Sequence, residues 1–554
     1  MSRMNKRLAL FMGLAVLFLV AFMGRTFYVQ VIAAPALQDK VEGQSVRTIT
    51  LEAPRGVIYD RNGEILAISR PMATVYANPS QVEDPIEAAA LLAPVLGIAE
   101  GELVEKLNGD TVFRYLARRI DEATGEKVAA LELNGIGVCS ESKRVYPKGA
   151  LAPQLLGFVG GDHYEGLAGL ELAYDEALSG LPGESRVVKD QDGNRLSTVS
   201  VKEAVPGTPI HLTIDAEIQY ETERVLAEAV EEFGAKKACA VVIDPGTGEV
   251  LAMANTPIFD TNRYSSASLM ESDRRNMVVT DQYEPGSTFK MVAVAAALEE
   301  GLVTPDTVFR LGKTITVYDR VVHEAHDETT PAVREYTVTQ ILSKSSNVGA
   351  VTLGMQVGKN KLVDMILKFG FTNKLGIDFP SEAPGQMLPP KDWSGTTIAN
   401  VPMGQGIAVS PLQLAAAYAA IANDGVMVQP HLVRDRGTPT TRQVVSKTVA
   451  TQLRDMLTVT VEDGTGKLAA VRGYSVAGKT GTAQKVKEEG GYYDDKVVAS
   501  FVGMVPADAP RLVILVTVDE PSTQQYGSAV AAPAFAKIAG FALRRLGVAP
   551  TVAD

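Results

Sequence analysis

The sequence predicts an α/β protein, of the α+β kind, in which an elongated β-rich domain and one transmembrane helix precede a C-terminal domain. The C-terminal domain is expected to hold a mainly antiparallel sheet with a helical insert. An uncharged apolar run starts at Leu8 and predicts the membrane helix. Strand-like runs occur at both ends of the C-terminal domain, and roughly 220 residues between them show helical periodicity. One sheet is therefore assembled from both ends of that domain.

Composition indicates a folded protein of several domains. The chain has 554 residues, of which 46% are hydrophobic and 21% are charged, which is typical of globular proteins. This length is sufficient for two or three domains and at least one large core. The net charge of −12 argues against a nucleic-acid partner.

The N-terminus predicts a single-pass membrane anchor over residues 8–32. The uncharged run covers Leu8–Gly24, and apolar side chains continue beyond it. At about 1.5 Å per residue, the longer segment can span a bilayer with some tilt. Basic residues before the run predict that residues 1–7 are cytoplasmic and that the bulk of the chain lies outside the cytoplasm. These basic residues are Arg3, Lys6 and Arg7.

A cleaved signal peptide is the competing interpretation of this segment. The small residues of Ala33–Ala36 would suit a cleavage site. However, the apolar run is long for a signal peptide, and Arg25 interrupts its approach to that site. We therefore favour an uncleaved anchor.

The region after the anchor predicts a β-rich domain over residues 40–205. Two strand-like runs flank Asn62-Gly63, a pair that tolerates positive φ and indicates a hairpin. Residues 83–133 look helical, with a break at Pro94. The rest is rich in glycine, proline and polar residues, which is typical of loops that join short elements.

The C-terminal domain is expected to begin after Pro206-Gly207. Asp215 is placed to cap a long amphipathic helix, and two apolar runs around Pro245–Gly248 predict an antiparallel hairpin. Three more strand-like runs lie late in the chain, and a final amphipathic helix ends at Gly547. The predicted limits are residues 206–548 for the domain and 549–554 for a tail.

Two cysteines, Cys139 and Cys239, lie in apolar runs that look like strands. Buried free thiols are the favoured interpretation for both. A single disulfide between them stays open, because nothing in the sequence supports it.

The stretch EPGSTFK, Glu284–Lys290, carries the first chemical signal. Ser287 follows a Pro-Gly turn and precedes a helical run, a position where serine is most often an ordinary helix cap. The three-residue spacing, however, places Lys290 on the same helix face. A desolvated lysine, or one near a second cation, loses proton affinity and could activate the serine hydroxyl as a nucleophile. The helix N-terminus would favour the oxyanion that develops.

Two further motifs extend this pattern. Ser345–Asn347 forms a polar break between two predicted helices, and Lys479–Thr482 lies in the first of the late strands. Alone, they would be a cluster of helix caps and an edge strand that contains a glycine. A strand glycine also lets a ligand approach the backbone, and the neighbouring cation and hydroxyls would suit a carboxylate. Together the order S-x-x-K, S-x-N, K-T-G is a strong signal.

These three motifs resemble those of the serine penicillin-recognising enzymes, which include penicillin-binding proteins and class A and D β-lactamases. Further stretches resemble class B penicillin-binding proteins over nearly the whole chain. Those similar to the non-catalytic pedestal are RGVIYDRNG, RVYP and GLAGLE. Those similar to the transpeptidase domain are IDPGTGEVLAMAN, YEPGSTFK, SKSSNVG, GQGIAVSPLQLA, VEDGTGKLA and AGKTGTAQ. Among class B members the chain most resembles the septal, cell-division branch, and the elongation-specific branch is the runner-up.

The resemblance implies a penicillin-binding-protein/β-lactamase-like transpeptidase domain behind a dimerisation-type pedestal. It implies that Ser287 attacks the D-Ala-D-Ala carbonyl of a peptidoglycan stem peptide, and that the acyl group then passes to an amino group on a neighbouring stem. β-Lactams would acylate the same hydroxyl. Lys290 would be the base, and backbone N–H groups of Ser287 and Thr482 would form the oxyanion hole.

The resemblance also assigns roles to the other motif residues. Ser345 would relay a proton to the leaving amine, Asn347 would hold the substrate amide, and Lys479 would tune the local potential. The K-T-G strand would form the substrate-binding and oxyanion side of the site through Thr480, Gly481 and Thr482. The two threonine hydroxyls would bind the substrate carboxylate.

The same resemblance implies a setting and partners. The protein would lie in the bacterial cell (inner) membrane as a single-pass protein with a cytoplasmic N-terminus. Its partners would be peptidoglycan stem peptides, β-lactams, a membrane-embedded glycosyltransferase and other division proteins. No cofactor, metal or nucleic acid is implied.

Two rival functions use the same motifs. A D,D-carboxypeptidase or β-lactamase would have no use for a pedestal of roughly 170 residues, since such hydrolases act without one. A non-enzymatic division scaffold or β-lactam sensor is disfavoured by the intact Ser287, Lys290 and Lys479.

Three shorter patterns are rejected. Gly464–Lys467 ends like a phosphate-binding loop, but the required first glycine is Val461. Gly404–Gly406 lacks the third glycine of a dinucleotide-binding loop. His323–Asp327 could hint at a metal, but a solvated loop is the better interpretation, because it holds only two histidines and its helical geometry is doubtful.

Overall fold

The computed structural model forms two compact units, and the chain passes between them several times. It describes residues 3–32, 46–109, 111–161, 164–189, 195–265, 270–324, 332–434 and 437–552. The smaller unit, called here the pedestal unit, comprises Met1–Arg55, Pro71–Ser142 and Ser179–Gly207. The larger unit, called here the catalytic-motif unit, comprises Gly56–Arg70, Lys143–Leu178 and Thr208–Asp554.

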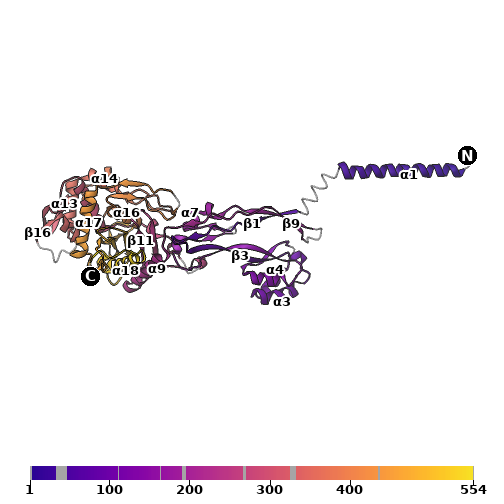
Figure 1. The fold of residues 1–554 in the computed structure, drawn as a ribbon, viewed down its shortest axis with the longest axis horizontal. Helices are drawn as coiled ribbons and strands as arrows, with labels where there is room; N and C mark the ends of the chain where they lie inside the picture. The colour runs from indigo at the N-terminus through magenta and orange to yellow at the C-terminus, as the bar shows by residue number, and fades with distance from the viewer. Residues whose placement is uncertain are drawn as a thin grey trace. The chain divides into compact units, whose positions relative to one another are not determined.

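The N-terminal helix α1 (Arg3–Phe27) continues as a π-helical turn over Tyr28–Ile32. Figure 1 shows α1 as a long, uninterrupted helix. Within the described residues, Met4–Ile32 is the one helix that is long and apolar enough to cross a membrane. At about 1.5 Å per residue, its 29 residues reach roughly 43 Å, which exceeds the hydrocarbon thickness.

The pedestal unit contains a three-stranded antiparallel sheet and a small helical cluster. The sheet has the order β1-β8-β9, with strands β1 (Val46–Leu51), β8 (Gly183–Lys189) and β9 (Arg195–Lys202). The cluster consists of α3 (Pro85–Leu96), α4 (Glu100–Leu107), β4 (Arg114–Ile120) and α5 (Glu122–Ala129). The cluster surrounds a core of its own that includes Leu92, Leu103 and Leu116.

Two predictions for this region need correction. Pro94 lies inside α3 and does not break the helix, which ends at the left-handed Gly97. A proline so close to the C-terminus of a short helix removes only a single intrahelical hydrogen bond, so the remaining turn is retained. The segment predicted as helical also contains the strand β4 (Arg114–Ile120), in which Leu116 is buried in the core of the cluster.

The predicted Asn62-Gly63 hairpin is present. It joins β2 (Ile58–Tyr59) to β3 (Ile65–Ala77), which pair antiparallel. Of the two turn residues, only Gly63 has a positive φ, at +86°. The buried Asp60 side chain closes the turn by accepting hydrogen bonds from the backbone N–H groups of Asn62 and Glu64.

The main sheet of the catalytic-motif unit is antiparallel and draws on both ends of the predicted C-terminal domain, as expected. Its strand order is β12-β11-β23-β22-β21. The strands are β11 (Lys237–Ile243), β12 (Val250–Thr256), β21 (Ala477–Val486), β22 (Tyr492–Val505) and β23 (Leu512–Asp519).

Helices cover both faces of this sheet, so β11, β12 and β23 are almost completely buried (Figure 1). On one face, α9 (Ala216–Phe233) and α18 (Gly527–Arg545) share a core with Ala238, Ala240 and Val242 of β11. On the other face, the alternate residues Cys239, Val241 and Ile243 belong to the core of the helical insert. Asp215 caps α9 as predicted, through Glu217 and Ile218 N–H groups.

The helical insert carries the S-x-x-K and S-x-N motifs, whereas the K-T-G motif lies in β21 of the main sheet. The longer helices of the insert are α11 (Lys290–Glu299), α13 (Asn347–Val357), α14 (Lys359–Lys368), α16 (Pro411–Ala422) and α17 (Lys447–Glu462). Shorter helices are α10 (Met277–Thr280), α12 (Val338–Ser343) and α15 (Thr397–Asn400). Paired short strands are β13 (Val308–Gly312) with β16 (Val333–Thr337), β14 (Thr314–Val317) with β15 (Arg320–His323), β17 (Gln386–Met387) with β18 (Ile407–Ala408), and β19 (Val426–Val428) with β20 (Thr441–Gln443).

Several N-terminal stretches belong to the catalytic-motif unit. They contain β5 (Ile136–Val145) in part, α6 (Pro153–Leu156), β6 (Val159–Gly160), β7 (Glu165–Gly166), α7 (Gly169–Ala173), α8 (Asp175–Ser179) in part and β10 (Ile210–His211). A fully buried ion pair joins two of these stretches, with 2.6 Å between Arg144 Nε and Glu171 Oε1. Arg144 also donates to the Gly56 carbonyl, and the Tyr146 hydroxyl donates to Glu171. The stretches RGVIYDRNG, RVYP and GLAGLE are therefore tied together by one buried polar cluster.

Candidate active site

The turn that carries Ser287 is a 3-10 helix over Gly286–Phe289, and α11 follows it directly. Neither helix start has a side-chain cap hydrogen bond, so Ser287 is not the ordinary N-cap that its position alone would suggest. Thr288 Oγ1 donates to the Pro285 carbonyl at 2.7 Å, and the buried Tyr418 hydroxyl donates to the Thr288 carbonyl at 2.8 Å. These contacts fix the backbone on both sides of Ser287.

The loop GQG at Gly404–Gly406 packs directly on this turn. The Gly286 N–H donates to the Gly404 carbonyl at 3.2 Å. Gly404 has a φ of +80°, and a Cβ atom there would lie 2.2 Å from the Gly286 carbonyl oxygen. Glycine is thus required both by the backbone conformation and by the close approach.

Lys290 points from the first turn of α11 to the S-x-N motif. Its Nζ donates to the Ser345 carbonyl at 2.6 Å, to Ser345 Oγ at 3.1 Å and to Asn347 Oδ1 at 2.7 Å. Ser345 and Asn347 come from the turn between α12 and α13, as the predicted polar break requires. The structure therefore brings the first two motifs into direct contact.

The environment of Lys290 favours its neutral form. The side chain is buried, with 1% of its surface exposed. Burial lowers the pKa of Lys290 to about 7, and the nearby Glu324 carboxylate opposes that shift. A lysine with a pKa near neutrality is a suitable proton acceptor for a hydroxyl at physiological pH.

Lys479 is the second buried ammonium of the site. It lies in β21 with none of its surface exposed, and its Nζ donates to the Thr480 carbonyl at 3.1 Å. Burial lowers the pKa of Lys479 well below its usual value, and the positive charge of Lys290 lowers it further. The two lysines thus disfavour each other's charged state.

The other K-T-G residues have distinct surroundings. Thr480 is buried and its Oγ1 lies 2.8 Å from Thr465 Oγ1. Thr482 is exposed, and its Oγ1 accepts a hydrogen bond from Gly527 N–H at the start of α18. A Cβ at Gly481 would lie 2.4 Å from Ser500 Oγ and 2.9 Å from Thr288 Cγ2, so glycine lets this strand approach the turn that carries Ser287.

The three motifs line one pocket of about 300 Å³. Ser287 comes from the first motif, Asn347 from the second and Thr482 from the third. Glu284, Arg320 and His323 add charged or titratable groups to the same wall. The three motifs therefore meet at one cleft, where a substrate carbonyl could reach the Ser287 side chain.

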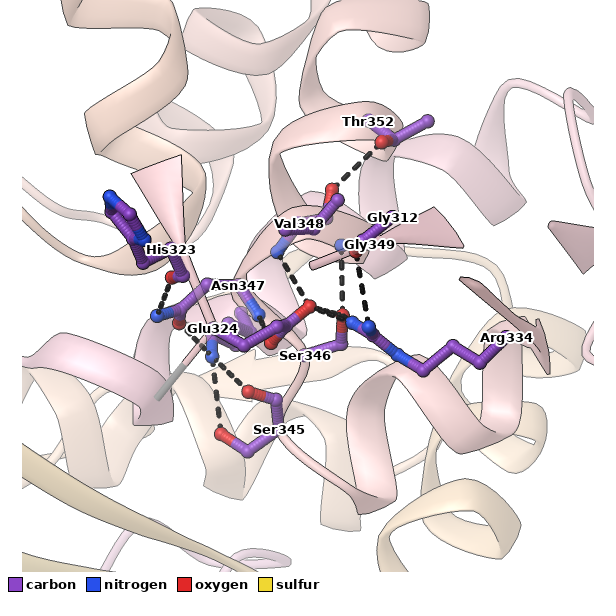
Figure 2. Close-up of polar contacts among 11 residues, drawn as sticks. Gly312, His323, Glu324, Arg334, Ser345, Ser346, Asn347, Val348, Gly349 and Thr352 are labelled. Carbon is purple, nitrogen blue, oxygen red and sulfur yellow. Dashed lines mark hydrogen bonds and ion pairs between the residues drawn. The ribbon is translucent and has the colours of Figure 1, made fainter. Parts of the chain in front are cut away.

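Sequence reasoning missed several residues of this site. Glu324 lies between Arg334 and the start of α13, where it accepts hydrogen bonds from the S-x-N segment (Figure 2). Thr465 contacts Thr480, and Glu284 accepts hydrogen bonds from Gly406 N–H and the Tyr492 hydroxyl. Thr465 and Glu284 do lie within the family-like stretches VEDGTGKLA and YEPGSTFK, which was the available signal.

The interpretation of His323–Asp327 as a solvated loop is wrong for Glu324. Its side chain is 6% exposed and forms an ion pair with Arg334. Burial is possible because the partner cation and the α13 N–H groups satisfy the carboxylate. His326 and Asp327 lie outside the described residues, and the described part of the chain holds no cluster of three metal-ligating side chains.

The cysteines do not pair. Cys239 is buried in β11, as predicted, but Cys139 in β5 is exposed, and both are free thiols. The expected burial of Cys139 is therefore wrong, because β5 has exposed residues at this point of the strand.

Two family models match the chain. The model described as the penicillin-binding protein transpeptidase domain matches residues 238–540. The model described as the penicillin-binding protein dimerisation domain matches residues 50–212.

Whole-chain relatives agree with these models. The probable peptidoglycan D,D-transpeptidase PbpC of Pseudomonas aeruginosa is 35% identical, over 99% of this chain and 97% of its own. The peptidoglycan D,D-transpeptidase FtsI of Escherichia coli is 34% identical, over 98% of this chain and 92% of its own. The crystal structure of penicillin-binding protein 3 from Mycobacterium tuberculosis in complex with aztreonam has a TM-score of 0.72 at 32% identity, covering 91% of this chain and 98% of its own.

The matched models account for both the pedestal stretches and the three-motif pocket. The FtsI relative covers nearly all of both chains, so the likeness is not confined to one domain. The chain belongs to the class B penicillin-binding proteins, with a dimerisation domain followed by a transpeptidase domain.

Proposed function

We propose that the protein is a peptidoglycan D,D-transpeptidase that crosslinks stem peptides through an acyl-enzyme on Ser287. The observation that carries this proposal is the meeting of the S-x-x-K, S-x-N and K-T-G motifs at one pocket. The relatives that bear the name D,D-transpeptidase over nearly the full chain support the same reaction.

Acylation begins when neutral Lys290 accepts the proton of Ser287. The serine oxygen bonds to the carbonyl carbon of the penultimate D-alanine, and the oxyanion is held by the N–H groups of Ser287 and Thr482. The C–N bond to the terminal D-alanine then breaks. Ser345, which lies 3.1 Å from Lys290 Nζ, passes that proton to the leaving amine.

Deacylation reverses this sequence with a different amine. The amino group of a neighbouring stem attacks the ester carbonyl, a new C–N bond forms, and the ester bond to Ser287 breaks. The proton released by the amine returns to the serine oxygen through Lys290 and Ser345. Asn347 holds the substrate amide, the hydroxyls of Thr480 and Thr482 bind its carboxylate, and Lys479 tunes the local potential. A β-lactam enters the first half of this sequence and remains as the acyl group.

Covalent labelling with a fluorescent penicillin tests the nucleophile. The full-length protein in detergent should label, and Ser287→Ala should not. Ser272→Ala, at an exposed serine of the same unit, is the matched control and should label normally. Normal labelling of Ser287→Ala would contradict the acyl-enzyme, and rapid spontaneous release of the label would indicate a hydrolase.

The finer proposal places the enzyme at the division septum. The stretch SFVGMVP at residues 500–506, which resembles the septal branch, and the full-length likeness to FtsI of Escherichia coli support it. Depletion in the source bacterium should then give filaments. Round cells would instead assign the protein to the elongation branch.

The proposal extends to location and partners. The apolar helix over Met4–Ile32 anchors the protein in the cell membrane, with the N-terminus cytoplasmic and the remainder outside. A membrane-embedded glycosyltransferase and other division proteins are the proposed partners, because the matched domains serve dimerisation and transpeptidation, and crosslinking needs newly polymerised glycan. Crosslinking in intact cells, followed by mass spectrometry of the captured proteins, tests this part.

A further inference from the structure

We propose that Glu324 is a positioning residue of this site: its carboxylate fixes the Ser345–Asn347 turn and places a negative charge near the Lys290 ammonium. This inference rests on the proposed function, since it concerns how Lys290 is prepared to accept a proton. Glu324 belongs to none of the three motifs and lies 22 residues from Ser346, with which it bonds.

The carboxylate of Glu324 binds the beginning of α13 with both oxygens (Figure 2). Its Oε2 accepts from Asn347 N–H at 2.8 Å, and its Oε1 accepts from Val348 N–H at 3.2 Å and from Ser346 Oγ at 2.7 Å. An anion at these N–H groups is also favoured by the helix dipole. The side chain of Glu324 therefore binds the first turn of α13 together with Ser346, the N-cap residue, whose Oγ accepts from Gly349 N–H.

The turn that Glu324 binds contains a residue in an unfavourable backbone conformation. Ser345 has a φ of +61°, a left-handed conformation that serine seldom adopts. In this conformation both the carbonyl and the hydroxyl of Ser345 meet Lys290 Nζ. Asn347 Nδ2 donates to the His323 carbonyl at 3.0 Å, so the residue before Glu324 holds the second Lys290 ligand as well.

The charged and polar groups around Lys290 come from several different elements. Lys479 on β21 disfavours an ammonium at this position, as burial does. Glu324, which directly follows β15, favours it, and Arg334 on β16 forms an ion pair with Glu324 and so partly neutralises it. Ser345 and Asn347 from the S-x-N turn offer neutral oxygens. Glu324 is thus the acidic group that opposes the loss of the Lys290 proton.

A purely structural helix cap would explain the contacts with α13 but would not couple to Lys290 titration. Glu324→Gln removes the charge and one of the two acceptor oxygens, so the pH of the acidic limb reports the charge and the plateau rate reports the position of the turn. Without that charge the pKa of Lys290 falls, so the amine becomes neutral at lower pH. Arg334→Gln should act in the opposite direction, because Glu324 is then no longer partly neutralised.

The test is the second-order rate of acylation by a chromogenic β-lactam, measured from about pH 5.5 to 9 on full-length protein in detergent. For Glu324→Gln we expect the acidic limb to move down by about one pH unit and the plateau rate to fall about 10-fold or more. For Arg334→Gln we expect the limb to move up. Glu335→Gln, an exposed carboxylate on β16, is the matched control and should leave the profile unchanged.

The outcomes distinguish the two proposals. If the wild-type protein is not acylated at Ser287, the proposed function fails. If it is acylated and both variants keep the wild-type acidic limb, the positioning role of Glu324 fails while the function stands. If Glu324→Gln does not fold, the pH–rate profile of Arg334→Gln is the test. An acidic limb that does not move up in Arg334→Gln would overturn the inference.

Discussion

Ser287, Lys290 and Gly404 show what a single residue contributes at this site. Hydrogen bonds of Thr288 fix the backbone around Ser287, the Lys290 amine is buried among neutral oxygens, and Gly404 allows two loops to touch. Burial of Lys290 lowers its pKa from 10.5 to about 7, so between these values the unfolded chain binds more protons than the folded one. The free energy of unfolding therefore rises with pH between about 7 and 10.5. At neutral pH, the burial of Lys290 still lowers the stability of the protein. This is the expected cost of a reactive amine.

Substituting Gly404 by alanine should disable the nucleophile turn. The new Cβ would collide with the Gly286 carbonyl, and the positive φ would add about 1 kcal/mol or more of strain. We expect the rate of penicillin acylation to fall at least about 10-fold, because small displacements of a reacting group are costly. Acylation kinetics combined with thermal unfolding measure this.

Gly97→Ala provides the control for Gly404→Ala. Gly97 follows α3 in the same left-handed conformation, with a φ of +67°, but a Cβ added at this position would have no neighbouring atom within 4 Å. This control variant should have the strained backbone conformation but should keep the wild-type rate of penicillin acylation. Equal effects in the two variants would mean that the close approach to Gly286 is unimportant.

The sequence predicts the motif residues but not the residues that contact and position them. Ser287 and Lys290 are found because helical spacing connects them. Glu324 is not found, because it follows a strand and meets Asn347 only through tertiary structure, where no spacing rule applies. Thr465 is missed for the same reason, although its stretch is family-like.

At the scale of elements, buried polar contacts join short segments that have little apolar surface of their own. The Arg144–Glu171 pair and the Glu223 carboxylate are the main examples. Glu223 on α9 accepts hydrogen bonds from Ala152 N–H and from Gln219 Nε2, both at 2.8 Å. Such contacts are sensitive to single substitutions because their partners would be left buried and unpaired.

Glu171→Ala should destabilise the protein severely. It leaves the guanidinium of Arg144 buried without its carboxylate, a change that typically costs about 3–5 kcal/mol. Denaturant unfolding of the wild type and the variant measures the loss. Glu176→Ala, at an exposed carboxylate of α8, should change the free energy of unfolding by less than about 0.5 kcal/mol. A loss of similar size in both variants would contradict the role of the ion pair.

Glu223→Gln should flatten the dependence of stability on pH. Burial raises the pKa of Glu223 from 4.5 to about 7, so its contribution is complete below pH 4.5 and is lost as the pH rises through 7. The difference corresponds to about 3 kcal/mol. We expect the melting temperature of the wild type to fall relative to that of the variant over this range.

Glu232→Gln serves as the matched control for that comparison, since Glu232 is an exposed carboxylate on the same helix. Its melting curve should follow the wild type at every pH. A Glu223→Gln variant that also followed the wild type would show that the buried carboxyl does not titrate in this range.

At the scale of the whole molecule, the chain combines an apolar N-terminal helix with two compact units. The mainly antiparallel sheet, its covering helices and the helical insert are all predictable from periodicity. The division of residues between the units is not, because Gly56–Arg70 and Lys143–Leu178 join the catalytic-motif unit through tertiary contacts. The proposed boundaries at residues 40, 205 and 548 stay predictions.

Deletion of residues 1–32 should release the protein from the membrane. The removed segment is the apolar helix, so the truncated protein should appear in the soluble fraction after cell lysis. A full-length protein that retains Arg25 in its mature mass would exclude cleavage near Ala33–Ala36. A truncated protein that still sedimented with membranes would show a second attachment.

The strand order of the main sheet has a consequence for how the protein is made. The middle strand, β23, comes from Leu512–Asp519, and its contact between Cys239 and Thr517 spans 278 positions of the chain. Pairings this distant are slow to form and depend on late synthesis. With the proposed membrane topology, the chain must therefore cross the membrane almost completely before this sheet can assemble, and β11 and β12 need protection from aggregation until the last segment emerges.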